Sequence, residues 1–370
     1  MKKLISLLLT FSLALSLISC NIKHSDDPNE STSSTETGDP NESTSSTETG
    51  VNTSSAPMVT FSHEVAVYQD TVFYCDRNEG GKIKRQNLSN IQSTGTPLYP
   101  SNNRNIFSGV ESGTQFIIDP IATEKNGGHP ILYIYLKKGY GLSGELVAFN
   151  TKNNEVRILK ENTPDVKQFL LYGEYLIFSI NEGVSGRTIH SIQTDGTELC
   201  TLENRYKYTM FPQNVLNGEI YFTKGRDLYK APLSLESSSL VAEKVADTVF
   251  FEGGYMYYTN VGTYPDSLET DRHLFRVDLN HASEKQSVIG QPLFGIVQDS
   301  LFLYYVGVEG NTVYLYAAET NESETVYPNK GRKKLGCFSD SYICFLETSG
   351  GESFLLYYDI NTKEEIRIPY

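Results

Sequence analysis

Two short runs, Tyr175-Leu176-Ile177-Phe178 and Ile189-His190-Ser191-Ile192, decide the fold of this chain. Aromatic and β-branched residues in runs of four, bounded by polar segments that contain glycine, are typical of neighbouring β-strands. The same pair of runs returns along the chain. Further first strands begin at Val72, Ile220, Tyr255, Leu301 and Tyr342, and their partners begin at Ile83, Leu228, Leu274, Val313 and Leu355. The pattern therefore predicts a repeated antiparallel unit.

The repeat is marked by the turn residues Asp70, Gly113, Gly173, Gly218, Gly254, Asp299 and Asp340, which give steps of 43, 60, 45, 36, 45 and 41 residues. This period is close to the ~40–45 residues of a four-stranded propeller blade. Regular short strands and almost no helical periodicity leave few competing architectures. We predict an all-β fold, a β-propeller of seven four-stranded antiparallel blades. Six or eight blades follow if the unit at Gly113 is miscounted.

The expected blades begin near His63, Asn105, Asp165, Gln213, Val245, Gly295 and Lys334. The longest step contains the stretch from Asp119 to Pro130, which we interpret as an insertion. Because adjacent blades stack face to face, their inner strands need two apolar faces. The 25 Tyr and 18 Phe, in a chain without Trp, are expected to fill these interfaces. Ile366 to Tyr370 already supplies the last outer strand, so end-to-end packing alone is expected to close the ring.

The amino-terminus has the pattern of a lipoprotein signal peptide. Lys2 and Lys3 precede an apolar run, which ends at Leu17-Ile18-Ser19-Cys20. The run is shorter than the ~20 residues of a membrane span. We expect residues 1–19 to be removed and Cys20 to carry lipid, which would anchor the protein outside the cytoplasm at the cell surface.

Residues 20–56 have the composition of a spacer. The twelve residues from Asp27 to Gly38 return unchanged from Asp39 to Gly50. Ser, Thr, Glu, Pro and Gly without an aromatic residue cannot bury enough apolar area to offset chain entropy. This segment is expected to be a disordered linker, with the propeller domain at 57–370.

A family resemblance is carried by Thr194-Asp195-Gly196-Thr197, which lies between two strand-like runs. This frame resembles the repeat of TolB-type propellers and of a bacterial family of unknown function similar to the low-density-lipoprotein-receptor propeller. It returns in altered form at Leu274 to Asn280 and at Tyr357 to Thr362. The resemblance implies a lipid-anchored, extracytoplasmic propeller that acts as a binding or scaffold module. It supplies no catalytic residues.

Several sequence motifs lack the structural context that their chemistry needs. Gly139 to Gly144 spells Gly-x-Gly-x-x-Gly, but a strand-like run follows it, where phosphate binding needs a helix amino-terminus. The sequence contains neither Gly-x-Ser-x-Gly nor His-Glu-x-x-His.

The net charge of −14 argues against nucleic acid as a partner. We expect no metal and no cofactor. Cys337 and Cys344 flank a turn, so a disulfide between them is geometrically possible.

These observations favour a non-enzymatic binding or scaffold module for a peptide, protein or glycan, in a monomer that touches the membrane only through its lipid anchor. The alternative is a glycan-active enzyme with paired carboxylates in the central funnel, drawn from Asp119, Glu182, Asp266 and Glu309. An enzyme is the less favoured of the two, and no residue is assigned a catalytic role.

Ligand contacts are expected on the loops that join the second and third strands of each blade, because recognition commonly lies on loops held by a rigid scaffold. The candidate ligand-binding residues are Tyr140, Glu182, Arg187, Tyr264, Asp266, Glu269, Asp271, Arg272 and Glu309. They combine aromatic rings, carboxylates and two arginines. Such a set suits a peptide or a glycan.

The first test concerns the anchor. Cys20→Ala removes the thiol that would be acylated, so the protein should move from the membrane fraction to the soluble fraction. Fractionation followed by immunoblotting measures this shift, with Ser19→Ala as the control that keeps the thiol and a small residue before it. Unchanged membrane association of Cys20→Ala would rule out lipid attachment at this residue.

Overall fold

The computed structural model describes residues 59–370 apart from 77–78, 91–94, 112, 140–142, 168, 205–207, 244, 253, 261–273, 280–284, 290–292, 300–301, 308–312, 318–321, 328–332, 339–341, 350–351 and 370. The residues proposed as signal peptide and linker, with Cys20, lie outside this part of the chain. All described residues belong to one compact unit, Ser55–Tyr370.

The described strands form seven antiparallel sheets, which we number 1 to 7 along the chain. Sheet 1 contains β2 (Val65–Tyr68), β3 (Thr71–Asp76), β4 (Lys82–Asn87) and β5 (Thr96–Pro97). Sheet 2 contains β6 (Gln115–Ile118), β7 (Ile131–Lys138), β8 (Ser143–Asn150) and β9 (Glu155–Lys160). Sheet 3 contains β10 (Phe169–Tyr172), β11 (Tyr175–Asn181), β12 (Arg187–Gln193) and β13 (Cys200–Thr201), with β1 (Val59–Phe61) as a fifth strand.

Sheet 4 contains β14 (Met210–Leu216), β15 (Glu219–Lys224), β16 (Asp227–Pro232) and β17 (Ser239–Ala242). Sheet 5 contains β18 (Val245–Glu252), β19 (Tyr255–Asn260), β20 (Leu274–Asp278) and β21 (Lys285–Ile289). Sheet 6 contains β22 (Leu293–Asp299), β23 (Phe302–Gly307), β24 (Val313–Ala317) and β25 (Glu322–Tyr327). Sheet 7 contains β26 (Lys333–Phe338), β27 (Tyr342–Ser349), β28 (Glu352–Asp359) and β29 (Glu365–Pro369).

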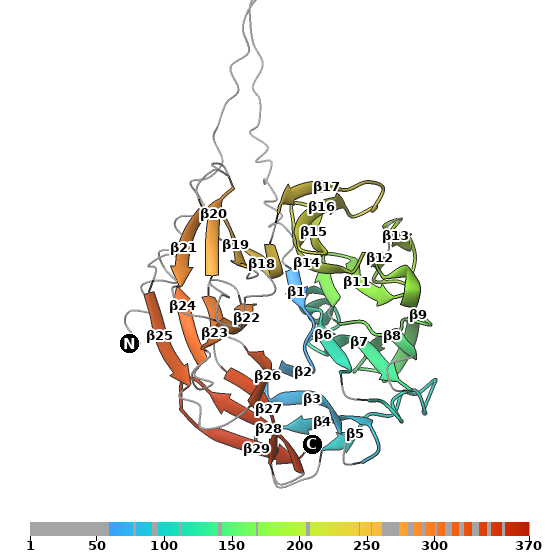
Figure 1. The fold of residues 1–370 in the computed structure, drawn as a ribbon. Helices are drawn as coiled ribbons and strands as arrows, with labels where there is room; N and C mark the ends of the chain where they lie inside the picture. The colour runs from blue at the N-terminus through green and yellow to red at the C-terminus, as the bar shows by residue number, and fades with distance from the viewer. Residues whose placement is uncertain are drawn as a thin grey trace, which may run out of the picture. The chain divides into compact units, whose positions relative to one another are not determined.

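The predicted class, an all-β propeller of four-stranded antiparallel sheets, is confirmed. Consecutive strands pair within each sheet, and the sheets follow one another in chain order with their first strands toward a common centre (Figure 1). The number of blades stays a prediction, although the described residues contain the seven sheets that it requires. Most first strands begin within a few residues of the predicted blade starts.

The second unit differs from its predicted boundaries. Its first strand begins at Gln115 and not near Asn105, and Gly113 precedes this strand. The turn between the first two strands is replaced by the predicted insertion, which contains the helix α2 (Pro120–Lys125). Asp119 caps this helix, because its Oδ1 accepts a hydrogen bond from the Ala122 amide at 2.8 Å. Pro120 occupies the first turn, where a missing amide proton has no cost.

Apolar clusters between consecutive sheets form the core. Phe73 and Ile83 of sheet 1 share a buried cluster with Phe116 and Ile134 of sheet 2. Leu170 of sheet 3 and Ile220 of sheet 4 belong to another cluster of the same kind. Sheets 1 to 5 therefore each bury a face against a neighbouring sheet, as the aromatic strand composition predicts.

The first and last sheets also pack against each other. Val65 and Tyr74 of sheet 1 lie in one cluster with Cys344 and Leu355 of sheet 7. Sheet 1 is built from β2 to β5 and sheet 7 from β26 to β29, so these two sheets share no strand. Closure by packing of the end sheets is thereby confirmed.

The strand β1 is a feature that the sequence did not predict. It pairs antiparallel with β10, the first strand of sheet 3, with Val59 opposite Tyr172 and Phe61 opposite Leu170. β1 therefore forms the edge of that sheet beside β10 and lies toward the common centre of the sheets (Figure 1). In the described part of the chain, no helix is long and apolar enough to cross a membrane.

The buried interface between sheets can be tested at Ile220, which is fully buried. Ile220→Asp places an unpaired carboxylate in an apolar cluster, so it should lower the free energy of unfolding by at least about 4 kcal/mol. Leu240→Asp in the same sheet is the matched control, because Leu240 is 50% exposed. Urea unfolding followed by circular dichroism measures both. Equal stability of the two variants would contradict the packing described here.

Candidate functional site

The loops between second and third strands share one side of the sheets with the connections between consecutive sheets. The Asn181 amide donates to the Pro164 carbonyl at 3.1 Å, and the Arg187 amide donates to the Tyr208 carbonyl at 3.2 Å. In sheet 2, the Thr163 amide donates to the Gly144 carbonyl at 3.0 Å. We call this side the loop face. It is the side on which the sequence places the candidate ligand-binding residues.

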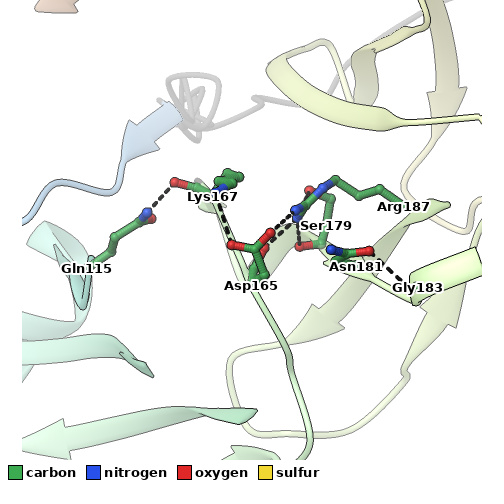
Figure 2. A network of polar contacts seen from close by, with 7 residues as sticks. All are labelled: Gln115, Asp165, Lys167, Ser179, Asn181, Gly183 and Arg187. Atoms are coloured by element: carbon green, nitrogen blue, oxygen red, sulfur yellow. Dashed lines mark hydrogen bonds and ion pairs between the residues drawn. The ribbon is translucent and has the colours of Figure 1, made fainter. Parts of the chain in front are cut away.

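Arg187 is the best-defined polar centre beneath the loop face (Figure 2). Its side chain is buried, and Nη2 lies 2.6 Å from Oδ2 of Asp165 while Nη1 donates to the Asp165 carbonyl at 2.5 Å. Nη1 also donates to the Ser179 carbonyl at 3.3 Å. The guanidinium lies 5.1 Å from the centre of the Phe211 ring. Arg187 thus joins strands β11, β12 and β14 to the segment that precedes β10.

Asp165 holds two cations at once. Besides Arg187, the ammonium of Lys167 lies 3.0 Å from Oδ1 of Asp165. Burial alone would raise the pKa of Asp165, but the hydrogen bond from Lys167 and the charge of Arg187 keep the pKa below its usual value. The carboxylate therefore stays charged and fixes the guanidinium in one geometry.

The polar network continues to the inner edge of sheet 3. Gln115 Nε2 donates to the Lys167 carbonyl, and Gln115 Oε1 accepts from the Ser62 hydroxyl at 2.7 Å. The Ser62 Oγ in turn accepts from the Phe169 amide at 2.9 Å. A chain of contacts thus runs from the loop face to the segment that follows β1.

Two of the nine candidate ligand-binding residues lie in the described part of the chain, at the ends of one loop. Glu182 begins the loop that contains the 3-10 turn η1 (Gly183–Ser185), and its side chain is 41% exposed. Arg187 ends the loop and is committed to Asp165. Tyr140, Tyr264, Asp266, Glu269, Asp271, Arg272 and Glu309 lie outside the described residues. That these residues bind a ligand stays a prediction.

Sequence reasoning missed Ser62, Gln115, Asp165 and Lys167. The partners in these contacts lie 53 residues apart for Ser62 and Gln115 and 107 apart for Ser62 and Phe169. No local sequence pattern predicts contacts between residues that lie so far apart in the chain. Asp165 alone had a signal, since it stands at a predicted blade start, where a connection meets the loop face.

His190 lies at the third-strand position that the repeat gives to an aromatic residue. It faces Phe178 across β11 and β12, and the two rings stack at 5.5 Å. Phe222 with Tyr229 and Tyr258 with Phe275 repeat this cross-strand pair in sheets 4 and 5. Burial, with a smaller contribution from Lys160, lowers the pKa of His190 to about 4. His190 is therefore neutral at pH 7, and Glu182, 4.0 Å away, forms no ion pair with it there.

Two chemical predictions can be placed in the structure. No group of three or more His, Cys, Asp or Glu side chains able to hold a metal ion occurs among the residues described. Cys337 and Cys344 face each other in the register of β26 and β27. Asp119 is used as a helix cap, and its Oδ2 accepts from the Tyr133 hydroxyl at 3.3 Å.

Comparisons with known proteins show that the fold is that of a β-propeller. No family model and no curated protein match the chain. The propeller domain of the trilobed protease from Pyrococcus furiosus, described as having an open velcro topology, is 11% identical with a TM-score of 0.54, and the match covers 84% of this chain and 96% of that one. A puromycin hydrolase is 12% identical with a TM-score of 0.55, covering 86% of this chain and 54% of that one.

A prolyl endopeptidase is 10% identical with a TM-score of 0.54, and the match covers 84% of this chain and 49% of that one. The chain thus spans about half the length of these two hydrolases. At such low identity the similarity establishes the fold alone. The propeller part of the family resemblance inferred from sequence is therefore confirmed.

The functional prediction made from sequence is wrong. It described a lipid-anchored, non-enzymatic binding or scaffold module for a peptide, protein or glycan, with a glycan-active enzyme as the alternative. The solved structures with this fold include a prolyl endopeptidase, a puromycin hydrolase and acylaminoacyl peptidases, in which the propeller accompanies a catalytic domain. The prediction rested on the shortage of reactive side chains in this chain.

Two histidines make stability depend on pH. Burial lowers the pKa of both His63 and His190 to about 4 in the folded protein, against about 6.5 when unfolded. Between these values only the unfolded chain binds the protons, so the free energy of unfolding falls as the pH falls from 6.5 to 4. His190→Phe should reduce the loss between pH 7 and pH 4.5 by about 2 kcal/mol.

Urea unfolding at the two pH values measures this difference. Phe is the chosen replacement because Phe275 occupies the equivalent position in sheet 5. His129→Gln, at an exposed histidine, is the control and should lose as much stability as the wild type. An unchanged pH dependence in His190→Phe would show that His190 is not the titrating group.

Proposed function

We propose that this chain is the propeller component of a peptide hydrolase, which admits peptide substrates to a catalytic unit outside the described residues. That unit is a further part of the protein or a partner chain. The proposal is supported by the fold similarity to a prolyl endopeptidase and a puromycin hydrolase, of which the chain spans about half. It also accounts for a sequence without Gly-x-Ser-x-Gly.

The loop face of sheets 3 and 4 is where such a catalytic unit would dock. Val184, at the tip of the loop between β11 and β12, is 87% exposed, and Tyr208 is 46% exposed. Arg187 links their backbones, since it ends the loop of Val184 and its amide binds the Tyr208 carbonyl. Exposed apolar side chains on loops beside a part-buried ion pair suit a protein interface, because little conformational freedom is lost on contact. The exposure of Val184 and Tyr208 is the observation on which the choice of the loop face rests.

We further propose that lipid on Cys20 retains the protein outside the cytoplasm. The charged start, the apolar run and the Ser19-Cys20 pair support this placement. The catalytic unit would then also act outside the cytoplasm. Its peptide substrates would be those available on that side of the membrane.

Site-specific photocrosslinking in the native cells tests the docking face. Val184 is replaced by p-benzoylphenylalanine, and the adducts are labelled with a fluorophosphonate probe that reacts with serine hydrolases. The matched control carries the same residue in place of Leu240, which is 50% exposed on the outer strand β17. The expected result is a probe-labelled adduct from position 184 and none from position 240. Labelled adducts from position 240 alone, or from neither position, would contradict the proposal.

A further inference from the structure

The inner edge of sheet 3 is the one place in the described residues where a sheet accepts an additional strand. The other described sheets have four strands, whereas sheet 3 has the order β1-β10-β11-β12-β13. The added strand comes from the distant amino-terminal segment and not from a neighbouring hairpin. Its pairing is antiparallel over three residues, Val59 to Phe61.

The acceptor and the added strand differ in how firmly they are held. All four residues of β10 are buried, while all three residues of β1 are only partly buried. β10 is fixed by a full ladder with β11, in which Phe169 faces Phe178 and Tyr172 faces Tyr175. The acceptor edge is therefore preformed, and β1 occupies it with few contacts of its own.

The contacts of β1 define what the edge recognises. Val59 and Phe61, two residues apart and hence on the same side of the strand, pack against the buried cluster that contains Leu170 and Ile220. Thr60 lies between them, opposite Leu171. The edge thus offers backbone hydrogen bonds and an apolar surface for alternate side chains. This is the general chemistry of strand addition to a sheet edge.

A polar clamp fixes the carboxyl-terminal end of the added segment. The Ser62 amide donates to the Phe169 carbonyl at 3.0 Å, and the Ser62 hydroxyl donates to Gln115 at 2.7 Å. One residue further, His63 and Phe116 exchange two backbone hydrogen bonds of 3.0 and 2.7 Å. The clamp sets the register in which a strand enters.

We propose that the inner edge of β10 is a binding site for extended peptides with apolar residues at alternate positions, and that β1 is an internal occupant which such a peptide displaces. The site deepens the function proposed above and rests on it for the choice of a peptide as ligand. Binding exchanges one set of backbone hydrogen bonds for another. A longer peptide gains from extending its contacts beyond the three residues of β1.

The test uses the full chain and a fluorescein-labelled peptide with the sequence of residues 57–64, Pro-Met-Val-Thr-Phe-Ser-His-Glu. Ser62 forms a hydrogen-bonded pair with Phe169, so by alternation Thr60 forms the next one with Leu171. Thr60→Pro removes this amide donor and should release β1. Thr60→Ala keeps the donor and is the matched control. Fluorescence anisotropy should show at least about tenfold tighter peptide binding to Thr60→Pro than to Thr60→Ala, the gain expected when a self-occupied site is freed.

A second peptide, with Asp in place of the Val and the Phe, should not bind to either variant. A second measurement covers the case in which Thr60→Pro fails to fold. In the wild-type protein, saturating peptide should accelerate amide hydrogen exchange at residues 59–61, since these residues leave the sheet. Equal affinities of the two variants, or unchanged exchange at 59–61 under saturating peptide, would overturn the proposal.

The two proposals fail separately. Loss of the crosslinked hydrolase with intact peptide exchange would contradict only the role beside a catalytic unit. A crosslinked hydrolase without peptide exchange at β1 would contradict only the binding site on β10.

Discussion

The structure depends on one constraint, that each sheet must cover the apolar face of the next. A twisted four-stranded sheet has two faces, and a neighbour on each side is the simplest way to bury both. The cluster of Phe73, Phe116 and Ile134 meets this need between sheets 1 and 2, and that of Val65 and Leu355 meets it between sheets 1 and 7. Face-to-face stacking directs the first strands inward and leaves the connecting loops free on either side.

The sequence predicts features that depend on near neighbours. Alternation fixes the register within hairpins, so the aromatic pair of Phe178 and His190 recurs as Phe222 and Tyr229. The helix α2 had a local signal as well, because Asp119-Pro120 is an N-cap followed by proline, but the spacing of the turn residues indicates only an insertion. The strand β1 had none, since its partner lies more than a hundred residues away. Partner choice at that distance depends on the assembled ring.

Arg187 shows how a buried cation beside a loop is held in place. At the end of a polar loop, its guanidinium lies between Asp165 and the ring of Phe211. Sheet 1 has a comparable arrangement, in which buried Lys84 lies 2.6 Å from both Asp76 and Glu79 beside the same kind of loop. Buried cations require such partners, since an unpaired one would cost several kcal/mol. Both sheets therefore carry a buried cation on the third strand, which binds Glu79 of the adjacent loop in sheet 1 and Asp165 of the connection before β10 in sheet 3.

The strand edges decide where a ring of sheets can exchange a segment without unfolding. The faces of the sheets pack in the core, and short strands such as β13 and β17 form the outer edges. The inner edge of β10 is preformed because β11 holds it, and closure of the ring rests on the contact between sheets 1 and 7. β1 contributes neither to the ladder of β10 and β11 nor to the contact between sheets 1 and 7. Its departure would expose one short ladder and leave the ring closed, so exchange at this edge is compatible with a stable fold.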